Sequence, residues 1–177
     1  MTDLVREYSN ALYSLAEEEG LQETINDELT ELVKCLDDQP DFMRLLNSHA
    51  ISKKERCRTL DEVFASQVNI YLLNFMKVLC ERNAFYAFRD CADAYHHRYN
   101  DAFGIVDASV VSAAPLKEEQ LQALKEKLGE LSGRRVNLHV ATDESLIGGL
   151  RVEMEGRRID NTIQTRLEQL RRTLVQS

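Results

Sequence analysis

The period of the hydrophobic pattern changes near Gly104, and this change constrains the fold more than any other feature of the chain. Before Gly104, apolar residues recur every three or four positions, as they do along one face of an α-helix. After it, the stretch IVDASVVSA is rich in β-branched residues, which is typical of a strand. We therefore predict an α+β fold, with an all-α domain over residues 1–104 and a small α/β domain over residues 105–177.

The first part is predicted to be an antiparallel bundle of six short helices. Ser52 and Glu55 are spaced as a capping box, which marks the start of one helix. The helix over residues 68–82 is apolar on more than one face, so it is central to the bundle or offers a second face to a partner. In chain order the six helices are expected at about residues 3–19, 24–36, 42–46, 52–64, 68–82 and 85–100.

The second part is predicted to have the order β-α-β-β-α. A strand, helix, strand unit connects through a right-handed crossover, so the first two strands are expected to be parallel and the third to return antiparallel. The first strand alternates poorly, which favours burial on both of its faces. The expected elements are a strand over 105–113, a helix from Lys117 to Ser132, strands over 135–141 and 146–154, a turn at Glu155 and Gly156, and a closing helix over 161–175.

Charge is distributed unevenly along the chain. Residues 1–104 hold 19 acidic and 11 basic residues, a net charge of −8, whereas residues 105–177 hold 11 of each. Binding to a nucleic-acid backbone depends on clustered Lys and Arg, so the acidic first part argues against such a partner. No run of about 18 apolar residues occurs, and the start MTDLVREYSN lacks the apolar core of a signal peptide. The chain as written is therefore expected to be soluble.

Two features resemble binding or catalytic sites, and both are interpreted as scaffolding. Gly148 and Gly149 precede a strand pattern, whereas a phosphate-binding glycine loop precedes a helix. A bulge or a close approach of the strand explains them better. Asp160 stands directly before the closing helix. An N-cap is a better interpretation of it than a general base, because no His, Ser or Cys is placed nearby to work with it.

The remaining candidates for chemistry are His96, His97 and the cysteines. Adjacent residues on a helix point about 100° apart, so the two histidines cannot chelate one ion, even with Cys91 upstream. The four cysteines are widely spaced without a C-x-x-C pair, which favours reduced, mostly buried thiols over a disulfide frame or a zinc site. These cysteines are Cys35, Cys57, Cys80 and Cys91. The residues alone therefore indicate no catalytic constellation, no cofactor site and no metal site.

The chain also resembles a known family. The stretches VVSAAPLKEEQLQALKEKL and RRVNLHVATDESLIGGLRVEMEGRRIDNTIQTRLEQL resemble the C-terminal signature of the ATP synthase delta subunits, whose mitochondrial counterpart is the oligomycin-sensitivity-conferring protein. The first part agrees more loosely, through REYSNALYSLA and NFMKVLCERN. One departure is Cys80 with Glu81, where a smaller residue is commoner in the family. The resemblance covers essentially the whole chain.

The resemblance implies a non-catalytic stator subunit of the rotary, proton-translocating ATP synthase, which links the catalytic head to the peripheral stalk and resists the torque of the rotor. It implies that the helical domain binds the amino-terminal helices of the alpha subunits and that the second domain binds the b subunits of the stalk. It also implies a peripheral position on the cytoplasmic face of the bacterial inner membrane, with membrane contact only through the complex. Neither a nucleic acid nor a cofactor is implied.

Two sets of residues are predicted to matter for these partners. A helix of the alpha subunits is expected in a groove between the opening helix and the helix over residues 68–82, where small Ala11 lets two backbones approach. The closing helix presents an apolar stripe, which is core only or also meets the stalk. The predicted groove residues are Tyr8, Ala11, Leu12, Leu15, Phe75, Val78, Leu79 and Arg82. The predicted stalk-binding or signature residues are Gly148, Gly149, Asp160, Asn161, Leu167, Leu170 and Leu174.

Two alternatives to a stator subunit are open at the level of sequence. The β-α-β-β-α order and the IGG run resemble a small RNA-binding or other interaction module in the second part. Against RNA binding, no G-x-x-G joins two helices and this part has no net positive charge. The other alternative is a small enzyme with an unrecognised site, which assays for nucleotide hydrolysis and bound metal would distinguish from a stator.

Overall fold

The computed structural model describes residues 2–146, 148–154 and 156–160, and it confirms an α+β protein with a helical region followed by a small sheet. The chain divides into two compact units, which meet in sequence between Tyr99 and Asn100. This division falls inside helix α6 (Phe88–Phe103), and Gly104 directly follows that helix. The hydrophobic period therefore changes where the helix ends, a few residues beyond the division between the units.

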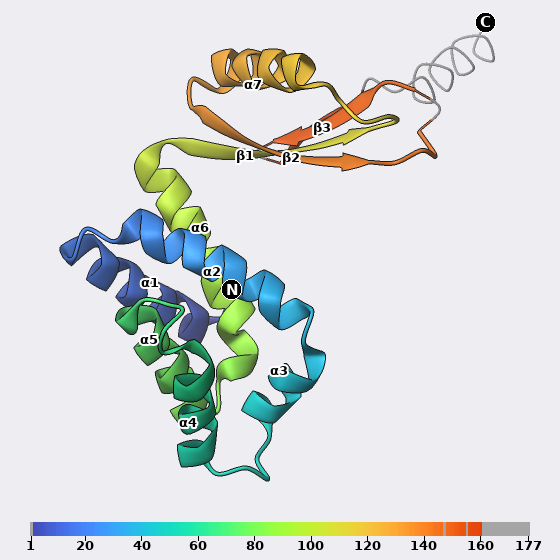
Figure 1. The fold of residues 1–177 in the computed structure, drawn as a ribbon. Coiled ribbons are helices and arrows are strands. Elements are labelled where there is room, and N and C mark those ends of the chain that lie inside the picture. Colours follow the sequence, from blue (N-terminus) through green and yellow to red (C-terminus); the bar gives the residue numbers. More distant parts are fainter. Residues whose placement is uncertain (1, 147, 155, 161–177) are drawn as a thin grey trace, which may run out of the picture. The chain divides into compact units, whose positions relative to one another are not determined.

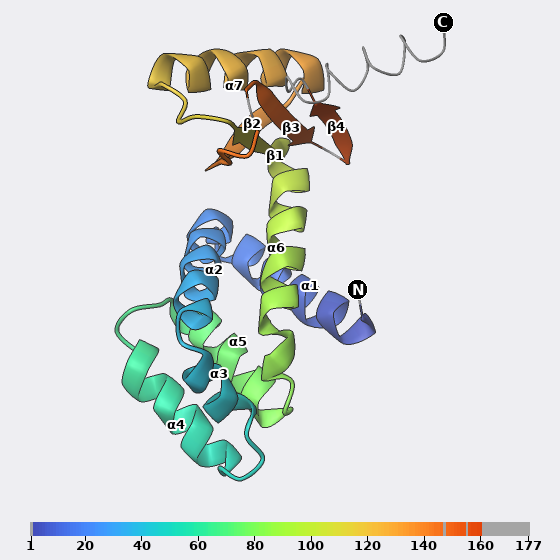
Figure 2. The same cartoon turned by 90° about the vertical axis from the view of Figure 1, so that its right-hand side faces the viewer.

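The helical unit consists of six α-helices and one turn of 3-10 helix. Figures 1 and 2 show the arrangement of the α-helices from two sides. The observed ends of the helices differ from the expected ones by three residues at most. Before α6 in chain order the elements are α1 (Asp3–Glu18), α2 (Gln22–Asp37), α3 (Pro40–Asn47), α4 (Lys53–Phe64), α5 (Ile70–Glu81) and the 3-10 helix η1 (Phe85–Ala87).

Local capping explains where these helices begin. The expected capping box is present: the Ser52 hydroxyl accepts from the Glu55 amide, and the Glu55 carboxylate accepts from the Ser52 amide, each at 3.2 Å. Asn69 caps α5, because its side chain accepts from the Tyr71 amide at 3.0 Å. The cap places the first residue of α5 at Ile70 rather than at the expected Val68.

The core of the helical unit is built around one face of α5. Leu72, Met76 and Leu79 on this face are fully buried. Phe85 and Phe88 stack with their ring centroids 5.3 Å apart, just after the turn that follows α5. The unit therefore has an apolar core of its own, which is the physical requirement for folding independently.

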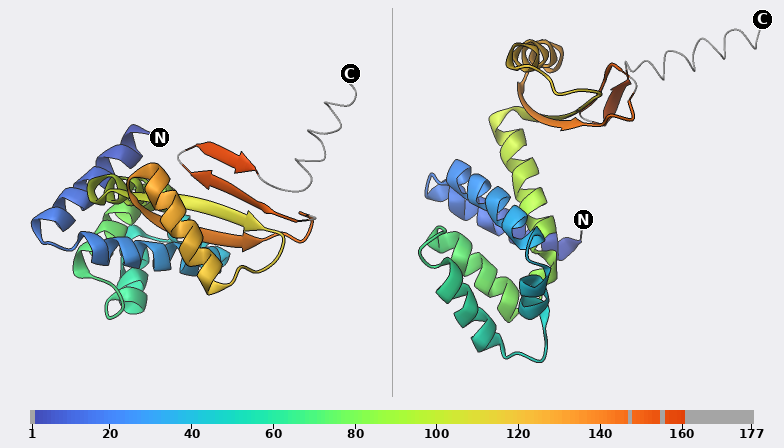
Figure 3. Two further views of the ribbon diagram at one scale, coloured as in Figure 1. Left: turned by 90° about the horizontal axis from the view of Figure 1, so that it is seen from above. Right: turned by 45° about the vertical axis from the view of Figure 1, so that its right-hand side comes forward.

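In its described residues, the second unit is a mixed four-stranded sheet in the order β2-β1-β3-β4, with helix α7 on one face (Figures 1 and 3). Strands β1 and β2 are parallel, and β3 returns antiparallel to β1, as the crossover rule predicts. The elements are β1 (Ile105–Ser112), α7 (Glu118–Ser132), β2 (Arg135–Thr142), β3 (Leu150–Met154) and β4 (Arg157–Asp160). Gly133 ends α7 in the left-handed conformation at φ 67°, as expected for a C-terminal glycine.

Three expectations for the second unit need correction. Strand β4 was not expected, because its sequence RRID is too charged to show an apolar alternation. Strand β3 begins at Leu150 and not at Leu146, because Gly149 has φ 89° and so departs from extended backbone. Strand β1 is not buried on both faces: its buried residues alternate, and Ser109 on the other face is exposed. The expected closing helix over 161–175 lies outside the described residues.

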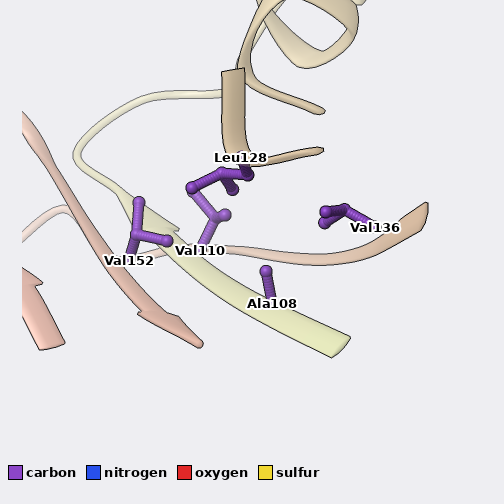
Figure 4. Close-up of a cluster of buried hydrophobic side chains, with 5 residues drawn as sticks. All are labelled: Ala108, Val110, Leu128, Val136 and Val152. Carbon is purple, nitrogen blue, oxygen red and sulfur yellow. The ribbon is translucent and has the colours of Figure 1, made fainter. Parts of the chain in front are cut away.

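The core of the second unit lies between the sheet and α7. Figure 4 shows five buried side chains in this layer: Ala108, Val110, Leu128, Val136 and Val152. They come from three strands and from α7, so one small apolar cluster joins the sheet to its helix. The opposite face of the sheet carries polar residues, among them Asp107, which accepts from Asn137 at 3.1 Å and from Asn100 at 2.6 Å.

A fragment of residues 1–104 is expected to be soluble and strongly helical, because it keeps α6 whole and contains the complete apolar core described for the helical unit. Its free energy of unfolding should reach about 5 kcal/mol, the lower end for a domain of this size. Circular dichroism during urea titration measures both properties. A fragment without helical signal, or one that melts without cooperativity, would show that the helical unit depends on the sheet.

Candidate functional site

The predicted partner groove maps onto neighbouring helices, because α1 and α5 pack against each other (Figure 1). Their ends also meet: Tyr71 at the start of α5 lies beside Glu19 at the end of α1. Burial and then a hydrogen bond with Glu19 raise the pKa of Tyr71 above its ordinary value. The two helices therefore run antiparallel, which brings one residue stripe of each along their shared boundary.

Helix α1 carries three of the predicted residues outside the core. Tyr8 and Leu15 are half-buried, and Ala11 between them is exposed. Their spacing of three and four residues keeps them on one stripe of the helix. Leu12, also predicted for the groove, is buried in the core instead. Ala11 thus lies on the surface, and its single methyl group leaves the α1 backbone open to close approach.

Helix α5 buries one apolar face and also exposes two aliphatic side chains on its other side. One face is the core face described above, with predicted groove residues Phe75 and Leu79 both buried. On another face, Ile70 is 58% exposed and Val78 is 40% exposed, although both are large aliphatic residues. They lie about two turns apart on the exposed side of the helix, with the exposed, polar Asn74 between them. Two large aliphatic side chains exposed on one side of a helix make that side a candidate for contact with a partner.

We refer to Tyr8, Ala11, Leu15, Ile70 and Val78 as the α1–α5 surface. Of the eight residues predicted for the groove, the structure places four on this surface and three in the core beneath. Arg82 is exposed at the C-terminal end of α5, beyond Val78. Ile70 is the residue that the sequence-based prediction missed; its spacing of eight from Val78 was the available signal.

The described signature residues of the second unit lie at the start of β3 and the end of β4. Gly148 and Gly149 directly precede β3, and the Gly149 carbonyl accepts from the Ala113 amide at 3.4 Å. Asp160 ends β4, and its carboxylate accepts from the Arg151 side chain at 3.1 Å. These contacts tie β1, β3 and β4 together. Asn161, Leu167, Leu170 and Leu174 lie outside the described residues, and so does the helix that Asp160 was expected to cap.

No metal-binding group of three or more His, Cys, Asp or Glu occurs among the described residues. The Nδ1 atom of His96 lies 2.9 Å from the Asn26 side-chain oxygen, so this histidine joins α6 to α2. The pKa of Asp143 is lowered by hydrogen bonds from the side chain and the backbone of Ser145. A carboxylate bonded in this way stabilises a turn, and its lowered pKa makes it a poor proton donor.

Comparisons with known proteins agree over almost the whole length of the chain. A family model described as "ATP synthase delta (OSCP) subunit" matches residues 4–174. The chain belongs to the ATP synthase delta (OSCP) subunit family. It is 31% identical over 180 residues to "ATP synthase subunit delta" of Alkaliphilus oremlandii (strain OhILAs), covering 99% of this chain and 100% of that protein. It is 30% identical over 171 residues to the protein of that name from Desulfitobacterium hafniense (strain Y51), covering 97% and 96%.

A solved structure supports the same fold. The chain is similar, with a TM-score of 0.73 and 19% identity, to a chain of the cryo-EM structure of the Toxoplasma gondii mitochondrial ATP synthase hexamer, with 98% of each chain covered. As a delta (OSCP) family member, the protein is a non-catalytic stator subunit of ATP synthase that works with other subunits of that complex. Because the family match spans both units, an RNA-binding role for the second unit alone is not supported. In the described part of the chain, no helix is long and apolar enough to cross a membrane.

Two cysteines of this delta-family chain, Cys80 and Cys91, are expected to behave as packing residues. Burial raises the pKa of Cys80 to about 12 and that of Cys91 to about 11, whereas Cys35 is exposed. Since the thiolate is the nucleophile, a thiol with pKa 12 is ionised to about one part in ten thousand at pH 8. Iodoacetamide at pH 8 should therefore modify Cys35 first, and Cys80 and Cys91 only after denaturation. Mass spectrometry of timed samples measures this order, and rapid modification of native Cys80 would contradict it.

Proposed function

We propose that the helical unit, an antiparallel six-helix bundle, binds the amino-terminal helices of the ATP synthase alpha subunits through the α1–α5 surface. The observation that carries this proposal is the exposure of Ile70 and Val78 on a helix whose other face already fills the core. An amphipathic helix recognises its partner through apolar residues at such spacings. A partner helix lying along α5 would cover both residues at once.

The small side chain of Ala11 supports the same occupant. A helix lying between α1 and α5 approaches most closely where the side chain beneath it is smallest, and the exposed Ala11 lies between the larger Tyr8 and Leu15. Burial of apolar surface contributes about 25 cal/mol per Å², so covering Ile70 and Val78 stabilises a complex by about 1 to 3 kcal/mol before other contacts are counted. The half-buried side chains of Tyr8 and Leu15 would add apolar contact area to the proposed complex.

The second unit is proposed to bind the b subunits of the peripheral stalk. The sheet face opposite α7 supports a scaffolding role for the described signature residues, because its charges pair with each other. Asp160 accepts from Arg151 at 3.1 Å and lies 3.7 Å from Arg158. The glycines Gly148 and Gly149 shape the entry to β3. The stalk contact itself is therefore assigned to the apolar residues that follow Asp160, namely Leu167, Leu170 and Leu174, after Asn161.

These two contacts together would prevent the catalytic head from turning with the rotor. Such a joint needs two separately folded ends, each with its own partner, because one end is attached to the head and the other to the stalk. We further propose that the complex places this chain at the cytoplasmic face of a bacterial inner membrane. The division into two compact units supports this arrangement.

The proposal is tested by reconstitution. Membranes that carry the proton channel and stalk, but lack this subunit, should bind the catalytic head weakly and should pump few protons when ATP is added. Adding the full chain should restore head binding and proton pumping, whereas the 1–104 fragment should bind the head without joining it to the membranes. Full restoration by the fragment alone would contradict the assignment of the stalk contact to the second unit.

A further inference from the structure

A cleft of about 1030 Å³ opens to solvent between the start of α4 and the end of α5. It lies in the helical unit and is distinct from the α1–α5 surface. We call it the α4–α5 cleft. Its lining residues are Lys53, Lys54, Cys57, Arg58, Asp61, Glu81 and Arg82. Six of these seven side chains are charged, which favours a charged ligand over an apolar one.

The lining of the cleft is positive in an otherwise negative unit. It holds four basic and two acidic residues, whereas residues 1–99 as a whole hold 11 basic and 18 acidic residues, a net charge of −7. Asp61 is already paired with Lys77, and Arg58 with Glu62. Among the described residues, no carboxylate lies within salt-bridge distance of Lys53, Lys54 or Arg82. These three cations are therefore available to an anionic partner.

A buried guanidinium adds a further positive charge behind the cleft. Arg56 is 1% exposed, and both of its acceptors are uncharged: the Leu46 carbonyl and the Asn83 side-chain oxygen, each at 2.7 Å. Its Nε atom has no hydrogen-bond partner. The charge acts on the cleft, because Arg56 opposes the rise that burial causes in the pKa of Cys57. No neighbouring carboxylate in the described contacts of Arg56 cancels this field.

The shape of the site favours an acidic peptide over a small anion such as phosphate. Phosphate binds where several backbone amides converge, and here the capping box already occupies the amides of Ser52 and Glu55 at the start of α4. The cations instead stand on long, flexible side chains of two helices. Lys54 and Arg58 are four residues apart on α4, so they are neighbours on one side of the helix. Both can therefore contact carboxylates of one bound peptide.

The cleft adjoins the α1–α5 surface through α5. Arg82 follows Val78 by one turn, so a chain that lies along the exposed stripe of α5 reaches the cleft at its end. We infer that the α4–α5 cleft binds an acidic segment of the same head-derived peptide whose apolar stripe covers the α1–α5 surface. This inference rests on the proposed function, and it adds a charged anchor that fixes the direction of the bound peptide.

The test is the variant Lys53→Glu/Lys54→Glu, titrated calorimetrically with the isolated catalytic head at low salt. Both residues lie in the first turn of α4, where the helix dipole stabilises acidic side chains. The variant should therefore fold as well as the wild type. We expect affinity about tenfold weaker, with the difference vanishing at high salt because the charges are then screened. The control is Lys34→Glu/Lys125→Glu, which makes the same charge change at two exposed residues outside the cleft.

Undiminished affinity of Lys53→Glu/Lys54→Glu would overturn the inference. The variant Ala11→Asp places a charge on the α1–α5 surface and so tests the proposed function separately. If Ala11→Asp abolishes head binding while Lys53→Glu/Lys54→Glu leaves it intact, the proposed function stands and only the charged anchor is rejected. A polyglutamate peptide should compete with the head for the wild-type chain and not for the variant. Competition by millimolar inorganic phosphate or ATP without competition by polyglutamate would also overturn the inference, because it would indicate a small-anion site.

Discussion

The variant Ala11→Asp is expected to bind a peptide of the alpha amino-terminal segment about a hundredfold more weakly than the wild type, or weaker still. In the complex, the new carboxylate would be pressed against the apolar stripe of the partner helix. Burying such a charge without a partner costs at least about 3 kcal/mol, and each 1.4 kcal/mol or so is a factor of ten in affinity. In the free protein the carboxylate stays in water, because Ala11 is exposed.

The control for this variant is Asn10→Asp. It adds the same charge one residue away, about 100° around α1. The Asn10 side-chain oxygen accepts from Arg98 at 2.7 Å, and an aspartate keeps that hydrogen bond. Both variants should melt close to the wild type, since surface substitutions usually change stability by less than about 0.5 kcal/mol. Equal affinity of Ala11→Asp and wild type would place the partner elsewhere, and a large loss of melting temperature would show that Ala11 supports the core.

Helix positions could be predicted from sequence because the signals that start and stop helices are local. The Ser52 and Glu55 capping box depends only on residues three apart, and it is formed as expected. The parallel pairing of β1 with β2 followed from the handedness of the crossover. Strand β4 was missed because it is an edge strand of polar sequence, whose register is fixed by pairing with β3 and not by its own pattern.

The candidate site was harder to predict, since it depends on which face of each helix the tertiary structure leaves uncovered. The second apolar face of the helix over residues 68–82 was visible in the sequence, but the assignment of its residues was not. Leu79 is buried and Ile70 is exposed, although both are aliphatic residues of one helix. The α4–α5 cleft had no sequence signal, because Lys53 and Arg82 meet only after α4 and α5 have packed.

The second large effect is expected from Arg56→Ala, which should destabilise the helical unit by about 3 kcal/mol or more. Arg56 is the largest fully buried side chain among the described residues. Its two hydrogen bonds join the end of α3 at Leu46 to the turn after α5 at Asn83. Hydrogen bonds from a charged group contribute about 1.5 to 3 kcal/mol each, and truncation also leaves a cavity. Removing the buried charge offsets part of this loss, because its desolvation is unfavourable.

The backbone at Asn83 makes this loss larger. Asn83 has φ 54°, a left-handed conformation that a residue other than glycine adopts at some cost, and Arg56 holds its side chain in place. Without that hydrogen bond, the turn between α5 and η1 loses its anchor.

Arg58→Ala is the matched control for Arg56→Ala. It removes an arginine two residues further along α4, whose ion pair with Glu62 is solvent-exposed and contributes at most about 0.5 kcal/mol. The melting temperature of Arg58→Ala should therefore be close to that of the wild type, and that of Arg56→Ala should be lower by roughly 10 °C or more. In a domain of this size, a loss of about 1 kcal/mol in the free energy of unfolding lowers the melting temperature by several degrees. Equal melting of the two variants would mean that the cost of burying the Arg56 charge balances both of its hydrogen bonds. A lysine at position 56 reaches only one of the two acceptors, so Arg56→Lys should melt between the wild type and Arg56→Ala.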